Sequence, residues 1–123
     1  MRVLYVDDEP DIRTVAVMSL QLNKDFEVHE CASGADALQI ARDWQPNVVL
    51  LDVMMPEMDG PMTRAAMRGD AATSDIPVVF VTARTQPSEL ERLLELGVTG
   101  VIAKPFDPMT LAQQVTALMG WQS

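Results

Sequence analysis

The sequence predicts an α/β fold, a doubly wound five-stranded parallel sheet with helices on both faces. Four short runs of β-branched and aliphatic residues, at 3–6, 48–51, 78–81 and 101–103, are typical of strands buried on both faces. Segments of helical period separate the runs, and this alternation favours parallel strands joined by right-handed crossovers. Each run also ends on a polar residue, so reactive side chains are expected to meet at one edge of the sheet.

The first half of the chain contains three expected strands and two helices. The first strand, 3–6, precedes a helix over 11–22, for which Pro10 suits the first turn. One face of this helix carries its inward residues: Ile12, Val15, Ala16, Ser19 and Leu20. Residues 26–32 alternate more and predict a strand nearer the edge. Ser33 is an expected N-cap for a helix through Trp44 that turns Ala37, Leu38, Ile40 and Ala41 inward.

The second half repeats the alternation. The third strand ends before a helix over 58–68, and Pro77 stands at the start of the fourth strand. Pro87 and Ser88 open a helix that carries four leucines and stops at Gly97. The last strand spans 100–103 and the last helix 107–119. We find no linker or repeat, so residues 1–123 are predicted to form a single domain.

Composition excludes several classes of function. The formal charge of −9 argues against nucleic acid as a partner, because phosphate binding needs clustered Lys and Arg. Cys31 is the only cysteine, so an internal disulfide is impossible and a reducing compartment is favoured. The sequence has neither a membrane-spanning stretch nor a signal peptide, and we therefore expect a cytoplasmic protein without a membrane partner.

The residues at the strand ends carry the expected chemistry. Asp7 and Asp8 follow the first strand, Asp52 the third, Thr82 the fourth and Lys104 the last. Two like charges about 4 Å apart repel by roughly 4 kcal/mol at an effective dielectric of 20, so three acids in one crevice need a compensating cation. Carboxylate oxygens, a backbone carbonyl and water suit Mg²⁺, and Lys104 adds one ammonium. An aspartate beside a divalent cation and an ammonium is equipped for phosphoryl transfer, in which the carboxylate attacks phosphorus.

Four motifs carry a resemblance to a known family. YVDDEPDIR, DVMMPEMDG, VFVTA and AKPF occur in this order and together span nearly the whole chain. In these motifs the chain resembles the receiver (CheY-like) domain of two-component response regulators. The resemblance implies a flavodoxin-like (βα)5 sheet of strand order 2-1-3-4-5. It also implies a switch that accepts a phosphoryl group from a sensor histidine kinase or a histidine phosphotransfer protein and does not turn over a separate metabolite.

The resemblance also implies individual roles. Asp52 would be the phosphoacceptor, and Mg²⁺ would be held by Asp7, Asp8, Asp52 and the backbone carbonyl of Met54. Thr82 would be the switch hydroxyl. Lys104 would contact the phosphoryl group, and the Lys104–Pro105 bond would be cis, as X-Pro bonds permit. The face of the last two helices and the strand between them would contact the downstream protein target.

One position departs from the family pattern. The family usually has an aromatic switch residue three positions before the lysine, where this chain has Val101. We therefore expect the conformational readout to depend on backbone shifts over 82–87. Ala83 is small and should leave a phosphoryl group open to water, which predicts a phosphorylated lifetime nearer minutes than days.

Other readings of the same residues fit less well. A phosphatase of the haloacid dehalogenase type needs a second acid two residues after its nucleophile, where this chain has Met54. A flavin site needs phosphate-binding amides after the first strand, and Asp8 and Glu9 would repel a phosphate there. A degenerate interaction module would not need all five chemical positions. A receiver excised from a larger regulator with a DNA-binding or enzymatic output domain remains the main alternative.

Overall fold

The computed structural model describes residues 1–121 and contains one five-stranded parallel sheet in the order β2-β1-β3-β4-β5. Strands and helices alternate along the chain, as the sequence predicts. Their bounds are β1 Arg2–Val6, α1 Pro10–Leu20, β2 Glu27–Cys31, α2 Gly34–Trp44, β3 Val48–Asp52, α3 Gly60–Arg68, β4 Val78–Thr82, α4 Pro87–Glu95, β5 Gly100–Ala103 and α5 Leu111–Met119. The fold is therefore flavodoxin-like α/β, with the predicted strand order.

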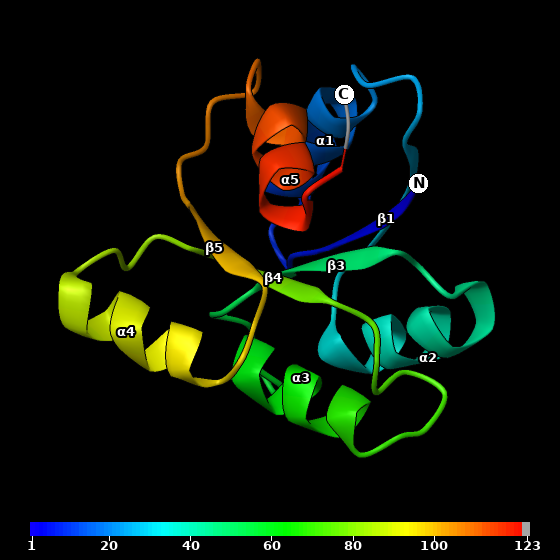
Figure 1. Ribbon diagram of the computed structural model, residues 1–123, viewed down its shortest axis with the longest axis vertical. Coiled ribbons are helices and arrows are strands. Elements are labelled where there is room, and N and C mark those ends of the chain that lie inside the picture. The colour runs from blue at the N-terminus through cyan, green and yellow to red at the C-terminus, as the bar shows by residue number, and fades with distance from the viewer. Residues whose placement is uncertain (122–123) are drawn as a thin grey trace.

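The helices form two layers, one on each face of the sheet. Figure 1 shows α1 and α5 together on one face and α2, α3 and α4 on the other. Alternate residues of each strand point to opposite faces, so Val3 and Tyr5 belong to the core under α1 and α5, whereas Leu4 and Val6 belong to the core under α2 and α3. Burial on both faces explains why the strand sequences are continuous apolar runs.

The edge and the central strands differ as expected. In β2, which lies at one edge of the sheet, only Cys31 is buried, while all five residues of β3 and of β4 are buried. The alternating sequence of β2 therefore reflects its position at the edge of the sheet. Ser33 caps α2 as predicted, its side chain accepting a hydrogen bond from the backbone N–H of Asp36 at 3.1 Å.

Three helices are shorter than the sequence predicts. The predicted helix 11–22 ends at Leu20, where the chain turns and the N–H of Leu22 bonds the carbonyl of Ser19. The predicted helix 58–68 begins at Gly60, because Asp59 caps it by accepting a bond from the N–H of Met62. The predicted helix 107–119 begins at Leu111, after a turn in which Asp107 accepts a bond from the N–H of Met109.

Val15 does not lie on the inward face of α1, contrary to the prediction. Its side chain is 42% exposed, whereas Ala16, Ser19 and Leu20 are buried and Ile12 packs partly against the core. The helix contacts the sheet along a narrower stripe than the apolar pattern indicated. Among the described residues no helix has the length and hydropathy needed to cross a membrane.

Candidate functional site

Three carboxylates meet at the carboxyl ends of β1 and β3. The two strands pair in parallel register, with Val6 opposite Leu51, so the residues that follow them are neighbours. Asp7, Asp8 and Asp52 each offer an oxygen within 4.8 Å of the others. Asp7 is fully buried, Asp52 is 3% exposed and Asp8 is half-buried. The cluster therefore opens to solvent on the Asp8 side.

Lys104 supplies the positive charge that faces these acids. It follows β5, and its Nζ lies 2.7 Å from Asp7 Oδ2 and 3.3 Å from Asp52 Oδ1. Burial acts to lower the pKa of Lys104, but the hydrogen bond to Asp7 and the two negative charges outweigh it and raise the pKa. The ammonium is thus held in its charged form. The Lys104–Pro105 peptide bond is cis, as expected.

Asp7 has a set of supports that the sequence reasoning did not identify. The hydroxyl of Tyr5 donates to Asp7 Oδ2 at 3.0 Å, and the backbone N–H of Glu9 donates to Oδ1 at 3.0 Å. Arg13 Nη1 donates to the main-chain oxygen of Asp7 at 2.8 Å. Burial, followed by the charge of Asp7, raises the pKa of Tyr5, so its hydroxyl stays protonated and can donate. The period-2 spacing of Tyr5 and Asp7 in an extended segment was the signal for this contact.

Ionisation of Asp52 is disfavoured in the folded chain. Burial raises its pKa from 3.8 to about 6, the charge of Asp7 adds to the increase, and Lys104 opposes it. The ammonium of Lys104 therefore does not offset the combined effect of burial and the charge of Asp7 on Asp52. An additional cation near these oxygens would stabilise the ionised form of Asp52.

The donor set fits a small divalent cation. Three carboxylates within one ion's reach are the hard oxygen ligands that Mg²⁺ prefers, and the half-buried Asp8 leaves space for water ligands. Burial, followed by the charge of Asp7, raises the pKa of Asp52, so a cation at the same place would stabilise its ionised form. Met54 borders this site, because its backbone N–H lies 3.4 Å from Asp52 Oδ1 while its side chain is 55% exposed.

Thr82 lies at the end of β4, one strand away from Asp52. Its side chain is buried, and its hydroxyl oxygen accepts a bond from the backbone N–H of Arg84 at 3.0 Å. The β3–β4 register pairs Asp52 with Val81, so Thr82 is one residue beyond the strand position facing Asp52. Val101, in the place of the expected aromatic, is half-buried and packs against the core under α2 and α3.

Gly60 is a second site residue that the sequence reasoning missed. A Cβ built at this position would lie 2.7 Å from the main-chain oxygen of Asp52 and 2.9 Å from Cα of Val53. The start of α3 thus approaches the end of β3 so closely that only glycine fits. The isolated glycine after the Asp52 loop was the signal for this close approach.

The remaining candidates lie away from the site. His29 stacks on Trp44 with ring centroids 3.9 Å apart, and Trp121 packs edge-on against Phe26, partly covering the core. Cys31 is buried, and burial raises the pKa of its thiol to about 11, in agreement with its reading as a small hydrophobe. Of the methionines after Asp52, Met55 and Met67 are buried in the core, whereas Met54 and Met62 are exposed.

Comparisons with known proteins agree with this geometry. The family model described as "Response regulator receiver domain" matches residues 3–116. The chain belongs to this family. This receiver domain is 34% identical over 120 residues to "Response regulator Rre1" of Synechocystis sp., and 34% identical over 117 residues to "Transcriptional regulatory protein SrrA" of Staphylococcus aureus. The matches cover 98% and 95% of the chain, respectively, but only 52% and 47% of those proteins.

Solved structures show the same architecture. The chemotaxis response regulator CheY4 of Vibrio cholerae superposes with a TM-score of 0.85 at 32% identity, covering 95% of this chain and 97% of that one. The signal receiver domain of the putative response regulator NarL of Mycobacterium tuberculosis gives a TM-score of 0.85 at 30% identity, covering 98% and 97%. The receiver domain thus spans about half the length of its curated relatives and nearly the full length of these solved chains.

Proposed function

We propose that this receiver domain is a phosphorylation-dependent switch in which Asp52 accepts a phosphoryl group from a phosphohistidine of a sensor kinase or a histidine phosphotransfer protein. The observation that carries the proposal is the position of Asp52, buried between Asp7 and Lys104 at the ends of the strands. In the transfer, an Asp52 oxygen bonds to phosphorus as the P–N bond to the histidine breaks. The leaving imidazole keeps the electron pair and takes up a proton.

The charges around Asp52 support this reaction. Lys104 lies 3.3 Å from Asp52 Oδ1 and is near enough to contact an oxygen of a phosphoryl group bound there. Asp7, Asp8, Asp52 and the backbone carbonyl of Met54 would hold Mg²⁺. When bound, Mg²⁺ supplies positive charge that offsets the charge of the carboxylates and of the transferring group. The chain would promote its own phosphorylation and dephosphorylation without acting on a separate metabolite.

The signal would leave the site through Thr82. Its hydroxyl oxygen accepts from the N–H of Arg84, so its own proton remains available to donate to a phosphoryl oxygen. A turn of Thr82 toward that oxygen would break the bond to Arg84 and release the segment 82–87. Helix α4, which follows, has no fully buried residue and contacts the core through the half-buried Leu93, so little packing would oppose its shift with this segment.

The output surface would be the face formed by α4, β5 and α5. Leu94 and Leu96, at the end of α4, are 50% and 43% exposed and are available for a downstream protein. Ala83 is small and exposed beside the site, which leaves the phosphoryl group accessible to water. We expect hydrolysis to reset the switch in minutes rather than days, in the cytoplasm.

A second form of the proposal is that residues 1–123 are the receiver of a larger regulator. The curated relatives are about twice as long as the matched region, and one of them is described as a transcriptional regulatory protein. A DNA-binding or enzymatic output domain would then follow the receiver domain. The complete reading frame distinguishes this form from a single-domain switch of residues 1–123.

Intact-mass spectrometry tests the phosphoacceptor. The protein is incubated with Mg²⁺ and acetyl phosphate, beside Asp52→Asn and the control Asp70→Asn, which changes an aspartate outside the site. We expect one phosphoryl group on the wild type and on the control, dependence on Mg²⁺, and none on Asp52→Asn. A phosphoryl group on Asp52→Asn would place the acceptor elsewhere and contradict the proposal.

A further inference from the structure

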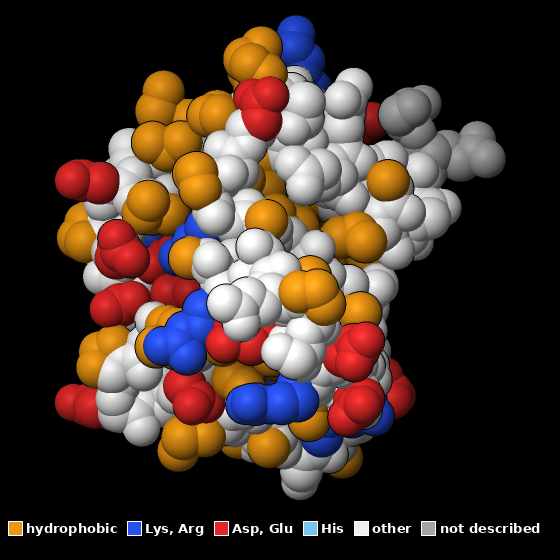
Figure 2. Space-filling model, turned by 90° about the vertical axis from the view of Figure 1, so that its left-hand side faces the viewer, with side chains coloured by type: hydrophobic (Ala, Val, Ile, Leu, Met, Phe, Trp, Pro, Cys, Tyr) orange, Lys and Arg blue, Asp and Glu red, His pale blue; other side chains and the backbone are white. Residues whose placement is uncertain are grey.

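Positive charge without an acidic partner gathers at α3 and α4. Within residues 1–121, the ion pairs involve only cations outside these two helices: Arg2, Arg13, Arg42 and Lys104. Apart from Lys24, the cations of that range without an ion pair lie on α3, on α4 and in the loop before α4: Arg64, Arg68, Arg84 and Arg92. Figure 2, which views the molecule from the α4 side of Figure 1, shows Lys and Arg side chains in its lower half.

Arg64 is the most buried of these arginines. It is only 9% exposed, whereas Arg68, Arg84 and Arg92 are exposed. Its guanidinium takes part in no ion pair among residues 1–121, and no nitrogen that is closed off from solvent lacks a hydrogen-bond partner there. The stem of Arg64 is therefore covered by protein while its free N–H donors open to solvent. A charged group in such a place gains from an acceptor supplied from outside.

The chain supplies no carboxylate that balances Arg64 within residues 1–121. Burial, followed by the charge of Arg68, lowers the pKa of Arg64, and no acid counteracts the two effects. The exposed acids of α4, Glu91 and Glu95, lie about 160° around the helix from Leu93, which packs against the core. They therefore point outward and not toward α3.

Arg64 lies in a groove between α3 and α4. A Cβ built at Gly97 would lie 3.4 Å from Arg64 Nη2, so the guanidinium sits against the end of α4. One turn earlier on α3, Pro61 lines a hollow of about 200 Å³ together with Arg92 of α4. Leu96, which is 43% exposed, is four residues after Arg92 and so lies on the same side of α4. We call this surface, from Pro61 and Arg92 to Arg64 and Gly97, the α3–α4 groove.

We propose that the Gly97 end of the α3–α4 groove binds a carboxylate from an acidic segment of a protein partner, with Arg64 as the anchor. A planar guanidinium with free donors matches a carboxylate, which accepts two parallel N–H bonds. Arg68, exposed one turn later, adds a second positive charge. The exposed Leu96 favours a peptide, which carries apolar groups beside its acids, over a free inorganic anion, which does not.

The net charge of the protein does not prevent this binding. The chain carries a formal charge of −9, which repels an acidic segment at long range. At physiological ionic strength, however, the interaction between exposed charges is largely screened beyond about 8 Å. The arginines of the groove therefore decide the local attraction.

The groove also borders the candidate site, and this part of the inference rests on the proposed function. Thr82 lines the hollow at the other end of the groove, so a movement of segment 82–87 would displace α4 relative to α3. Arg64 belongs to α3 and Gly97 follows α4, so the displacement would change the spacing of the groups around the carboxylate. Phosphorylation of Asp52 and binding of the acidic segment should then change each other's equilibrium constant by the same factor.

Peptide titration followed by NMR tests the binding. The probe is a capped hexapeptide with four glutamates and two leucines, and its control has glutamines in place of the glutamates. We expect the probe to shift the side-chain Nε–H signal of Arg64 and the backbone N–H signal of Gly97 with a dissociation constant of about 0.1–1 mM, and the control to bind about tenfold more weakly or less. If neither signal shifts at a probe concentration of about 10 mM, the proposal is wrong.

Matched variants separate Arg64 from general charge. Arg64→Leu should weaken binding by about tenfold, whereas Arg42→Leu, which removes an exposed arginine outside the groove, should leave it unchanged. Arg64→Leu replaces an unbalanced buried charge by an apolar group, so thermal unfolding should find it no less stable than the wild type. Arg64→Lys keeps the charge and should still weaken binding, because an ammonium cannot form the paired bonds. Equal binding by wild type and Arg64→Leu would reduce Arg64 to a support of α4 and overturn the proposal.

Inorganic phosphate distinguishes a free anion from an acidic segment. We expect phosphate to displace the glutamate probe only at concentrations about tenfold above those of the probe, because phosphate makes no apolar contact with Leu96. Displacement at equal or lower concentrations would assign the groove to phosphate and overturn the choice of a carboxylate.

Titration after treatment with acetyl phosphate and Mg²⁺ tests the coupling. We expect the affinity of the wild type for the probe to change by about fivefold or more, and that of Asp52→Asn, treated in the same way, to stay constant. If the treated wild type carries no phosphoryl group, the proposed function fails while the titration of the untreated protein stands. If it is phosphorylated and its affinity does not change, the coupling is wrong.

Discussion

Two aspartates of this receiver domain, Asp52 and Asp70, lie in charged clusters of opposite character. At the site, three acids face one ammonium, and burial with the charge of Asp7 raises the pKa of Asp52 to about 6. In the second cluster, between α2 and the α3–β4 loop, Asp70 accepts two hydrogen bonds from Arg42 and one from the N–H of Ala72, and its pKa is lowered, first by the bond from Ala72 and then by that from Arg42. The same residue type is destabilising when ionised in one place and stabilising in the other.

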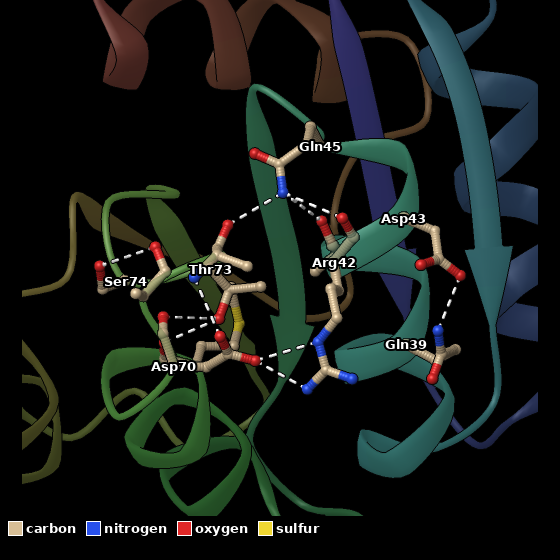
Figure 3. Close-up of polar contacts among 11 residues, drawn as sticks. Gln39, Arg42, Asp43, Gln45, Asp70, Thr73 and Ser74 are labelled. Carbon is tan, nitrogen blue, oxygen red and sulfur yellow. Dashed lines mark hydrogen bonds and ion pairs between the residues drawn. The ribbon is translucent and has the colours of Figure 1, made fainter.

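The second cluster needs no additional cation, because its charges are balanced within the chain. Figure 3 shows Gln45, whose amide donates to the carbonyls of Ala41 and Arg42 at the end of α2 and to that of Ala72 in the loop. These bonds hold Gln45 in a left-handed conformation at φ 54°. The charges of Arg42 and Asp70 balance each other, with Arg42 Nη2 2.7 Å from Asp70 Oδ2. The comparison indicates that excess like charge marks the candidate functional cluster, whereas charge balance marks the structural one.

Removal of Lys104 should have the largest effect. Lys104→Met leaves two buried carboxylates without their ammonium, and we expect the free energy of unfolding to fall by about 3 kcal/mol at pH 7 without Mg²⁺. Denaturant unfolding followed by circular dichroism measures it. Arg42→Met, which removes the exposed partner of Asp70, is the matched control and should cost much less. Equal losses in the two variants would remove the distinction between the clusters.

Neutralisation of Asp52 should stabilise the protein. Above pH 6 and without Mg²⁺, we expect Asp52→Asn to raise the free energy of unfolding by about 2 kcal/mol, because the ionised carboxylate is buried and repelled by Asp7. The folded pKa of about 6 exceeds the ordinary 3.8, so below pH 3.8 Asp52 is protonated and the wild type has its full free energy of unfolding. As the pH rises through 6, Asp52 ionises and the wild type loses the contribution of the protonated carboxyl to its stability. The gain in the variant should therefore vanish near pH 4. A constant gain at all pH values would contradict this account.

Mg²⁺ should stabilise the wild type moderately. A cation present at about ten times its dissociation constant adds about 1.4 kcal/mol to the free energy of unfolding. Thermal unfolding with Mg²⁺ and with EDTA measures the shift, which should be much smaller in Asp8→Asn. The same shift in Asp8→Asn would place the cation outside the acidic cluster.

Neutralisation of Asp70 should give the smallest effect and the opposite sign. Asp70→Asn loses a carboxylate whose pKa is lowered by its partners, so the variant should be slightly less stable than the wild type at neutral pH. The difference should disappear as the pH falls through the lowered pKa of the folded carboxylate, because the wild-type side chain is protonated only below that pKa. The stability of Asp70→Asn should respond to Mg²⁺ as the wild type does. A change in the Mg²⁺ response would show that the two clusters are coupled.

The sequence predicted the five strands and the β2 edge of the sheet well, because burial on both faces leaves a continuous apolar run and the exposed edge strand β2 has an alternating sequence. The run at 101–103 was predicted to be buried on both faces, but β5 is the other edge strand and is partly exposed. The helix ends were less accurate. The apolar pattern places Asp59 and Asp107 inside predicted helices. In the structure their side chains accept hydrogen bonds from the backbone N–H groups of later residues, so each helix begins after the aspartate. Local patterns do not reveal which backbone group a side chain will reach.

The sequence by itself determined which residues gather at the site, because in a parallel sheet the residues after successive strands share one edge. Tertiary structure alone decided how they act on one another. The contact of Tyr5 with Asp7, the close approach of Gly60 to Asp52 and the exposure of Val15 depend on distances between elements far apart in the sequence. Ionisation depends on those distances and on burial, and so the raised pKa of Asp52 is a property of the folded chain.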